Sequence, residues 1–271
     1  MPSRTPAPDA DLAFAHTLAD AAREIAAPLF RAGLAGESKR DDSFDPVTEA
    51  DRRIEAAMRD LIARDRPEDG VLGEEGEDAP SASGRRWVLD PIDGTRAFLA
   101  GLPTWCVLIG LVDESGPTLS VIDQPHTGER FSGLVAGERR EAWLDRAGDR
   151  RPLAARAGAS LDSAIVSTTD PYMFAGAEAA AFEGLRRRAA IARYGLDAYA
   201  YAALALGGVD LVVESGLKTW DVAALVPVVQ GAGGVITDWS GRPCHEGGQV
   251  LAAADPALHA EALALLSGAA D

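Results

Sequence analysis

Four short acidic segments carry the residue types that could perform metal-dependent chemistry. They span residues 45–51, 73–75, 90–95 and 220–221 of the 271-residue chain. Each places a carboxylate at the end of a predicted strand or the start of a predicted helix, where side chains from distant segments can converge on one point. Together the four segments predict a single cluster of carboxylates.

The segment Asp90-Pro91-Ile-Asp93-Gly94-Thr95 has the most informative spacing. A buried strand should end just before Asp90, and Pro91 should stop its ladder because proline has no N–H to donate. Two carboxylates three residues apart across this turn can face one cation. A short helix should follow, with the N–H groups of Gly94 and Thr95 at its N-terminus. There they can cradle a phosphate, which the glycine allows to approach closely.

Gathered carboxylates repel one another unless cations lie between them. Two like charges about 4 Å apart repel by roughly 4 kcal/mol at an effective dielectric constant near 20. Oxygen ligands without a nearby His or Cys favour Mg²⁺, or Mn²⁺, over zinc. The acids that we expect in this cluster are Glu74, Asp90, Asp93 and Asp221.

Such a centre suits the hydrolysis of phosphate monoesters. These esters hydrolyse so slowly in water that an enzyme must lower the barrier by on the order of 20 kcal/mol. One general base supplies about 10²–10⁴-fold. Metal ions that activate water and neutralise the leaving oxygen can supply much of the remainder. Thr95 and Asp51 are candidates for orienting that water.

Apolar periodicity predicts the elements that position these side chains. In the first half of the chain it predicts helices over residues 12–29 and 54–62, and strands over 71–72, 86–89, 105–112, 118–122 and 130–135. Residues 37–45 should form a polar loop, and residues 139–158 a solvent-facing hairpin that leads to a lobe boundary. In the second half it predicts strands over 164–167, 209–213, 234–237 and 249–253, and helices over 178–187, 198–206, 222–230 and 256–266.

This order of elements predicts a mixed α/β fold in which sheets are sandwiched between layers of helices. We expect residues 1–155 to form an N-terminal lobe with an antiparallel sheet and most of the metal ligands. Residues 156–271 should form a C-terminal α/β lobe with the substrate-recognition residues and the last metal ligand. The two lobes should make one compact catalytic unit.

The composition excludes several classes of partner. A formal net charge of -16 argues against nucleic-acid and anionic-membrane binding, which need clustered Lys and Arg. No stretch approaches the roughly 20 apolar residues of a membrane span. Residues 1–10 hold three prolines and no apolar run, so we expect no signal peptide. The two cysteines, Cys106 and Cys244, offer no disulfide framework. These features predict a cytoplasmic protein.

The four acidic segments, in this order, resemble the inositol monophosphatase family. The resemblance covers residues 12–266, and its most specific part is the run DPIDGT with Trp-Asp 125 residues after Thr95. It implies a layered α-β-α-β-α sandwich, usually a homodimer, that hydrolyses a small phosphorylated metabolite with two or three Mg²⁺ ions.

The same resemblance assigns roles to residues of this chain. It implies one metal held by Glu74, Asp90 and the Ile92 carbonyl, and a second held by Asp90, Asp93 and Asp221. A third, weaker metal would use Glu74. Thr95 and Asp51, with Glu74, would position the nucleophilic water. Gly94, Thr95 and Asp221 would contact the substrate.

Three further segments look like the histidinol-phosphate phosphatase branch of the family: residues 95–105, 124–130 and 193–201. Inositol phosphatases tend to have Ser or Ala where this chain has Asp197. A carboxylate there, with Glu214, suits a substrate that bears an ammonium group and an imidazole. Leu196, where this branch often has glycine, and Thr-Trp-Asp221 in place of Pro-Tyr-Asp depart from the branch. We therefore predict hydrolysis of L-histidinol phosphate, with an inositol-1-monophosphatase or a broader sugar or nucleotide phosphatase as the alternative.

Other interpretations compete with this one. The haloacid dehalogenase type of phosphatase needs a nucleophilic Asp where Pro91 stands, which excludes it. A non-catalytic metal or phosphate sensor stays open. Single residues also have structural explanations: Asp51 has capping-box spacing from Thr48, and Thr95 and Asp197 could be helix N-caps. Asp221 is placed where a helix dipole favours an acid. Lys39 and Arg40 could reach a phosphate, although charged loops are usually solvated.

Overall fold

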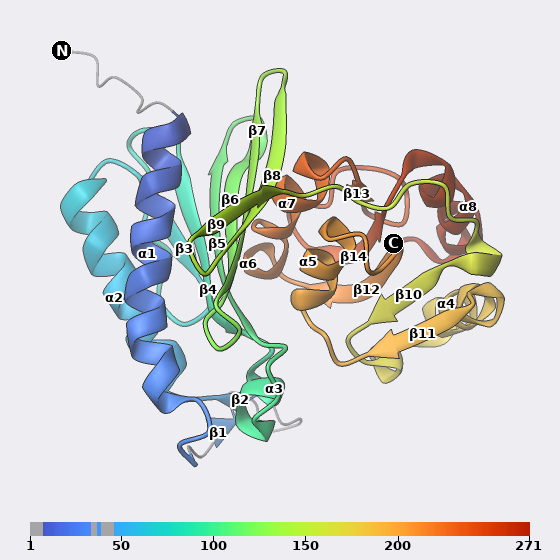
Figure 1. Ribbon diagram of the computed structural model, residues 1–271, viewed down its shortest axis with the longest axis horizontal. Coiled ribbons are helices and arrows are strands. Elements are labelled where there is room, and N and C mark those ends of the chain that lie inside the picture. Colours follow the sequence, from blue (N-terminus) through green and yellow to red (C-terminus); the bar gives the residue numbers. More distant parts are fainter. Residues whose placement is uncertain (1–7, 34–36, 39–45) are drawn as a thin grey trace.

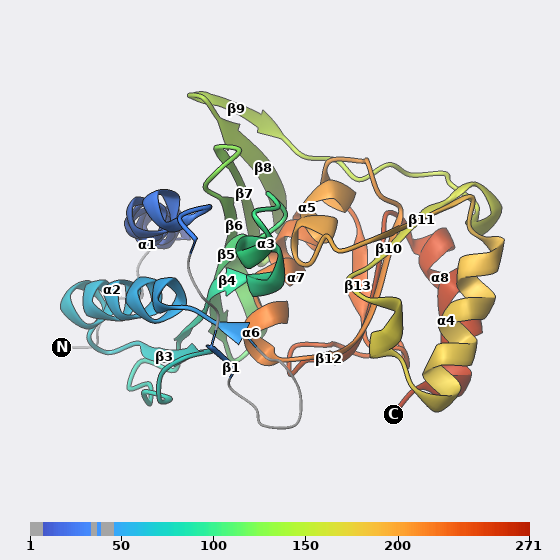
Figure 2. The ribbon, with the colours of Figure 1, turned by 90° about the horizontal axis from the view of Figure 1, so that it is seen from below.

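Five alternating layers of helix and sheet make up the computed structural model, which describes residues 8–33, 37–38 and 46–271. A helix pair, a seven-stranded sheet, a middle layer of short helices, a five-stranded sheet and an outer helix pair follow one another across the molecule (Figures 1 and 2). This arrangement confirms the predicted α-β-α-β-α sandwich. Lys39, Arg40 and most of the predicted loop over 37–45 lie outside the described residues.

The first layer consists of α1 (Pro8–Leu29) and α2 (Glu49–Asp65). Small apolar residues repeat along α1 at helical spacing, and Ala15, Ala19 and Ala22 are fully buried. On α2 the larger apolar residues Ile54 and Met58, four positions apart, are also fully buried. Both helices therefore pack closely on one face of the larger sheet, as the periodicity predicted.

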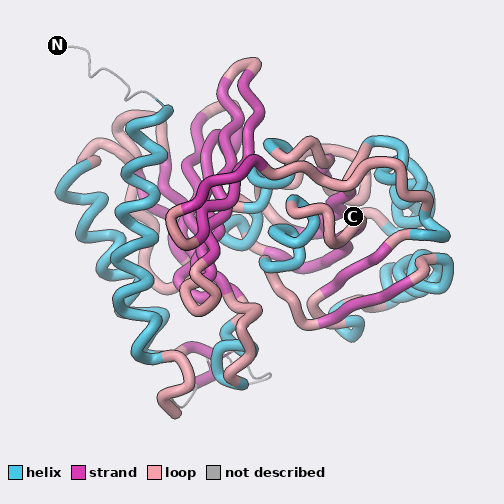
Figure 3. The backbone as a smooth tube through the Cα atoms, viewed as in Figure 1, coloured by secondary structure: helices cyan, strands magenta, loops and turns pink. Residues whose placement is uncertain are grey.

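The larger sheet has the strand order β3-β4-β5-β6-β7-β8-β9. Its β3 and β4 are parallel and its other neighbours antiparallel. The strands span Gly70–Gly73, Arg86–Asp93, Cys106–Asp113, Gly116–Gln124, Glu129–Ala136, Arg139–Arg146 and Asp149–Pro152. They form one continuous band of strands between the helices (Figure 3).

Two predictions in this half need correction. The hairpin expected to face solvent is β8 and β9, but β8 pairs with β7 and buries Ala142, Trp143 and Leu144, because this apolar run extends the core. Pro91 does not end its strand: β4 continues to Asp93, with its register shifted between Asp90 and Asp93. Asp90 pairs with Leu108 and Asp93 with Cys106, so β4 has one more residue than β5 over this stretch. Pro91 lies in this bulge-like irregularity, where the ladder needs no N–H from it.

The smaller sheet has the order β11-β10-β12-β14-β13, with β10 parallel to both neighbours and the other pairs antiparallel. Its strands span Ile191–Tyr194, Ile165–Thr168, Leu211–Leu217, Gly248–Ala253 and Val235–Thr237. The edge strand β11 was not predicted, because its four residues are mostly exposed and show no apolar alternation.

The outer layer consists of α4 (Gly176–Arg188) and α8 (Pro256–Leu266). The middle layer holds α5 (Tyr199–Ala205), α6 (Thr219–Val222) and α7 (Leu225–Gly231). The single helix predicted over 222–230 is thus two helices. A Cβ on Gly133 of β7 would overlap the α7 backbone at Pro227 and Val228, so this glycine permits the close contact between sheet and middle layer.

Short elements complete the described chain. They are β1 (Glu37–Ser38), β2 (Pro46–Val47), α3 (Thr95–Ala100) and the 3₁₀ turns Leu161–Ser163, Pro171–Met173 and Ser267–Ala269. The turn into α3 follows β4 directly, as predicted, and positions the acidic segment between the two sheets.

Candidate active site

Three of the predicted acids converge between the two sheets. Asp90, Asp93 and Asp221 each offer a carboxylate oxygen, and these oxygens lie within 4.8 Å of one another. Asp90 and Asp93 come from the irregular end of β4, and Asp221 from the first turn of α6. The backbone N–H of Lys218 donates to Asp221 Oδ2 over 2.6 Å, so this acid also caps the start of α6.

Glu74 approaches the same cluster from β3. It follows the last residue of that strand, and its N–H donates to the Leu89 carbonyl over 3.2 Å, which places it beside Asp90. Parallel pairing of β3 with β4 causes this, because the carboxyl ends of parallel strands meet at one edge. The negative charge of Glu74 is the largest electrostatic contribution, after burial, to a raised pKa of Asp90.

The two acids of β4 are held in place by backbone donors. The Ile92 N–H donates to Asp90 Oδ1 over 3.0 Å, and the Ala198 N–H donates to Asp93 Oδ2 over 2.7 Å. Burial raises the pKa of both carboxyls well above the usual range, and charged neighbours raise it further, Asp197 and Asp221 in the case of Asp93. An arrangement of this kind is costly when every member is ionised.

The donor set fits divalent cations. It consists of closely spaced carboxylate oxygens, which are the hard ligands that Mg²⁺ and Mn²⁺ take in proteins. Cations between them would offset the repulsion that raises the pKa of Asp90 and Asp93. The predicted ligand Ile92 lies in the same turn, and its carbonyl accepts a hydrogen bond from Thr95 Oγ1 over 3.1 Å.

Asp51 is both a cap and a partly unsatisfied acid. Its Oδ2 accepts from the Thr48 N–H over 2.9 Å and from the Thr48 hydroxyl over 2.5 Å, so the predicted capping box is present. Its Oδ1 is buried and has no hydrogen-bond partner within residues 8–33, 37–38 and 46–271. The charge of Asp51 contributes to the raised pKa of Asp90, so Asp51 lies near the cluster.

The N-cap of α3 is Gly94. The structural interpretation of Thr95 as the N-cap is therefore wrong. Gly94 has φ 79°, a left-handed conformation that favours glycine. Thr95 is therefore the first helical residue, and its hydroxyl donates back to Ile92. The turn presents Gly94 and Thr95 beside the acids of β4, as predicted.

Asp197 belongs to the wall opposite Gly94. It has φ 49° and precedes α5, whose N-cap is Ala198, so Asp197 is not a helix cap. A Cβ on Gly94 would lie 3.1 Å from Asp197 Cγ, which places the two residues in contact distance. Burial raises the pKa of Asp197 to about 6, against a lowering effect of Arg96.

Glu214 is 2% exposed at the middle of β12. One of its oxygens accepts from the Thr169 N–H over 2.9 Å and from the Thr169 hydroxyl over 2.5 Å; the other accepts from the Tyr201 hydroxyl over 3.2 Å. Burial raises its pKa to about 7, and the charge of Asp197 raises it too. Glu214 of β12 and Asp197 of the connection between β11 and α5 are therefore close enough to interact electrostatically.

The sequence profile of the inositol monophosphatase family matches residues 8–270. The chain belongs to the inositol monophosphatase family. It is therefore a phosphoric monoester hydrolase of a metal-dependent family that typically uses Mg²⁺.

Relatives of this inositol monophosphatase family member carry different names. The bifunctional phosphatase IMPL2 of Arabidopsis thaliana is 38% identical over 93% of this chain and 73% of its own length. The histidinol-phosphatase of Mycobacterium tuberculosis is 37% identical over 95% of this chain and 98% of its own length. The structure of an inositol monophosphatase from Zymomonas mobilis superimposes with a TM-score of 0.84 at 42% identity, over 97% of this chain and 99% of that one.

Residues that sequence reasoning missed hold the site of this phosphatase together. Glu55 of α2 is 1% exposed and accepts from the N–H groups of Glu75 and Gly76, each over 2.8 Å. It thereby fixes the loop that follows Glu74. An acid beside the apolar face of a helix was the signal available, but its partner loop is fixed only by tertiary structure. Thr169, which holds Glu214, was missed for the same reason.

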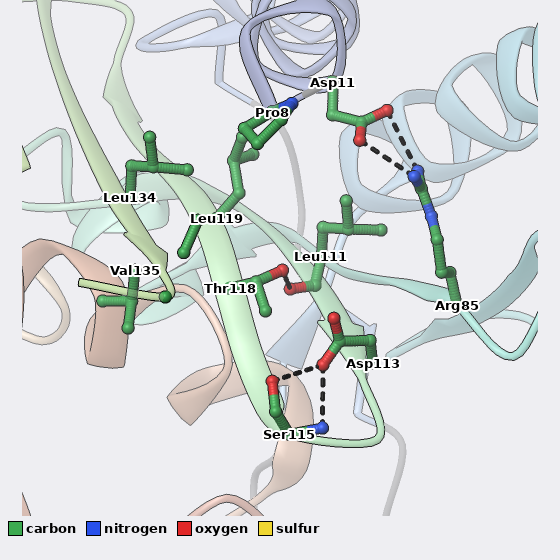
Figure 4. A pocket seen from close by; sticks show the side chains of 12 residues that line it. Pro8, Asp11, Arg85, Leu111, Asp113, Ser115, Thr118, Leu119, Leu134 and Val135 are labelled. Carbon is green, nitrogen blue, oxygen red and sulfur yellow. Dashed lines mark hydrogen bonds and ion pairs between the residues drawn. The ribbon is translucent and has the colours of Figure 1, made fainter. Parts of the chain in front are cut away.

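A cavity of about 310 Å³ lies elsewhere in this family member, between the start of α1 and the β5–β6 hairpin (Figure 4). Leu111, Leu119 and Leu134 line it. The two charged residues at its edge form an ion pair, in which Arg85 donates to both carboxylate oxygens of Asp11 over 2.9 and 3.0 Å. The described residues that line it include no predicted site residue.

The described part of this phosphatase, residues 8–33, 37–38 and 46–271, contains no helix that is both long and apolar enough to cross a lipid bilayer.

The raised pKa of Glu214 should make the stability of the protein depend on pH. The carboxyl has a pKa of about 7 in the folded protein and 4.5 in the unfolded chain, so the folded protein binds the proton more tightly. The free energy of unfolding should therefore fall as pH rises from about 4.5 to above 7. Glu214→Gln should remove that loss, worth up to about 3 kcal/mol above neutral pH. Urea unfolding in EDTA from about pH 5 to about pH 8 measures it. Equal pH dependence in both proteins would contradict it.

Proposed function

We propose that this phosphatase hydrolyses L-histidinol phosphate to L-histidinol and phosphate, with water as the nucleophile and Mg²⁺ as the cofactor. The observation that supports this choice of substrate is the pair of buried carboxylates Asp197 and Glu214. Both carboxyls are desolvated, and each pKa is raised. A substrate ammonium group or imidazolium beside them would stabilise their ionised forms, whereas the hydroxyl groups of an inositol carry no such charge.

The metal ligands that we propose are Glu74, Asp90, the Ile92 carbonyl, Asp93 and Asp221. When bound, the divalent ions would polarise the phosphate oxygens and make water a stronger nucleophile. A third, weaker site would use Glu74 again.

The phosphate and the water are positioned by protein groups on either side of the cluster. Asp51 Oδ1, which is buried and accepts no hydrogen bond from the described residues, is oriented by the two bonds from Thr48 to Oδ2. It can accept a proton from the attacking water, with Glu74 as a second acceptor and the Thr95 hydroxyl as an orienting group. The N–H groups of Gly94 and Thr95 hold the phosphate, and Asp221 adds a substrate contact.

A substrate panel tests this proposal. The purified protein with Mg²⁺ should prefer histidinol phosphate to inositol 1-phosphate and to 3′-phosphoadenosine 5′-phosphate in kcat/KM. Preference for either of the others would move the substrate assignment to the alternative. Metal binding by calorimetry without phosphate release from any monoester would instead favour the sensor interpretation.

Asp197→Asn should separate substrate binding from chemistry. Loss of one charge-assisted contact to an ammonium group should raise KM for histidinol phosphate by about 10–100-fold. Hydrolysis of p-nitrophenyl phosphate, which has no cation, should change by less than about threefold. Steady-state kinetics on both substrates measures the difference. Equal losses on the two substrates would show that Asp197 does not read the cation.

The runner-up is an inositol-1-monophosphatase or a broader sugar or nucleotide phosphatase. Thr219-Trp220-Asp221 favours it, and so does the similarity to the Zymomonas mobilis protein. Its metal and phosphate chemistry would be the same, so only the panel separates the two.

The lobe division and the assembly are also proposals. We place the division after residue 155, so that Glu74, Asp90 and Asp93 come from one lobe and Asp197, Glu214 and Asp221 from the other. A homodimer is supported by the edge strand β11, where Ile191 is 49% and Tyr194 is 41% exposed. Sedimentation equilibrium tests it. Cytoplasmic location stays a prediction from the sequence.

A further inference from the structure

We infer that Glu129 and Tyr199 are positioning residues, which hold residues 195–198 and with them the Asp197 carboxylate against the acid cluster of Asp90, Asp93 and Asp221. The inference deepens the proposed function and rests on it, because Asp197 is the residue that we assign to substrate recognition. Neither Glu129 nor Tyr199 belongs to the predicted site.

Two hydrogen bonds of the segment 195–198 itself, and a third from Tyr199 directly after it, connect it to the larger sheet and the turns beside it. The Thr104 hydroxyl donates to the Gly195 carbonyl over 3.1 Å. The Ala198 N–H donates to Asp93 Oδ2 over 2.7 Å. The Tyr199 hydroxyl donates to Glu129 Oε2, also over 2.7 Å. Thus all three partners lie between residues 93 and 129, whereas the segment itself connects β11 to α5 in the other half of the chain.

The conformation of Asp197 is one that such ties help to hold. Its φ of 49° lies in the left-handed region, which is less favourable for Asp than for glycine. Gly195, two residues earlier, is left-handed as well, with φ 73°. Loosening either end of the segment would let the backbone relax and turn the carboxylate away from Gly94.

The tie through Glu129 is built to be rigid. Glu129 is 8% exposed at the start of β7, and the oxygen that accepts from Tyr199 also accepts from the Thr127 hydroxyl over 2.8 Å. The Tyr199 ring packs edge-on against Phe131, with centroids 6.1 Å apart. Burial raises the pKa of the Tyr199 phenol, so its hydroxyl remains a donor at neutral pH.

Tyr199→Phe is the direct test, because it deletes the hydroxyl and keeps the ring on Phe131. KM for histidinol phosphate should rise by about tenfold, the scale of an indirect positioning contact. The affinity for Mg²⁺ and the turnover of p-nitrophenyl phosphate should stay within about twofold of wild type. Tyr172→Phe is the matched control, since Tyr172 is 92% exposed. Glu129→Gln keeps an acceptor and should behave as wild type, whereas Glu129→Leu should match Tyr199→Phe.

A double-variant cycle shows whether the effect passes through Asp197. If it does, Tyr199→Phe should add less than about twofold to KM in an Asp197→Asn background. Additive effects, or equal losses on both substrates, would overturn the inference, because Tyr199 would then act independently of Asp197 or only on stability.

Hydrogen exchange separates failure of this inference from failure of the proposed function. In the metal-free protein, the amides of residues 195–198 should exchange about tenfold faster in Tyr199→Phe than in wild type or in Tyr172→Phe. Unchanged exchange would overturn the inference whatever the substrate is. If exchange is faster in Tyr199→Phe but the enzyme prefers another phosphate ester, Tyr199 and Glu129 keep their positioning role. The assignment of histidinol phosphate as the substrate would then be wrong.

Discussion

Asp90→Asn should lower kcat/KM by at least about 10³-fold and yet raise the thermal stability of the metal-free protein. The family resemblance places Asp90 on both the first and the second metal. Losing its charge weakens the binding of both metals, because an asparagine oxygen is a neutral and poorer ligand. The rate effect of a bound metal is worth several kcal/mol, which corresponds to three or more factors of ten.

The opposite effect on stability follows from the electrostatics of the cluster. Asp90 is 2% exposed, and Glu74, Asp93 and Asp221 raise its pKa beyond the effect of burial. A carboxyl with a raised folded pKa weakens the folded state increasingly as pH rises above its unfolded value. Asparagine ends that loss and can still accept the Ile92 N–H through its side-chain oxygen. Without metal, the melting temperature of the variant should therefore exceed that of wild type, most clearly at about pH 8.

Addition of Mg²⁺ should reverse the order of the two proteins. A ligand at 100 times its Kd stabilises the folded state by about 2.7 kcal/mol, and wild type should gain more of this than the variant. Melting curves with EDTA and with Mg²⁺, together with phosphate release, make the measurement. Asp60→Asn, on the exposed side of α2, is the control. A variant that retains activity within about tenfold, or that melts lower in EDTA, would count against a metal role for Asp90.

Asp51→Asn should lower kcat by about 10²–10⁴-fold, the range of a general base, with little change in stability. The structure gives Asp51 two separate functions on two oxygens. Oδ2 completes the capping box with Thr48, and an asparagine oxygen can accept the same N–H bond. Oδ1 has no hydrogen-bond partner in the part of the chain that the structure describes, and asparagine cannot accept a proton there.

Thr48→Ala provides the complementary variant. It removes the hydroxyl that caps the Ala50 N–H over 3.1 Å, and should cost about 1 kcal/mol of stability with less than about tenfold effect on kcat. Steady-state kinetics and urea unfolding of both variants give the comparison. If Asp51→Asn behaves like Thr48→Ala, with stability lost and turnover kept, Asp51 is a helix cap and nothing more.

Local apolar patterns in the sequence were enough to predict most of the helices and strands. The small apolar residues of α1 and the apolar runs of β5 and β6 bury themselves at the spacing expected for a helix and for strands of a covered sheet. Predictions failed where an element lacked such a pattern. The four residues of β11 are largely exposed, and α6 and α7 separate within a continuous apolar run.

The acidic turn of β4 was predictable for a different reason. Asp90, Asp93, Gly94 and Thr95 are neighbours in the chain, so one local backbone conformation brings them together. Pro91 illustrates the limit of local reasoning: proline has no N–H, but the irregular pairing of β4 with β5 needs none at that point. The strand therefore continues through a residue that normally ends one.

The sequence by itself determined which residue types could bind cations and phosphate, because these depend on chemistry and on spacing within single segments. Only the tertiary structure decided which distant groups face them. Asp93 reaches Ala198 across 105 positions of the chain, and Tyr199 reaches Glu129 across 70. Contacts of that kind arise where two sheets pack through a shared helix layer, and no local pattern encodes them, because each partner is chosen by the packing of the whole chain.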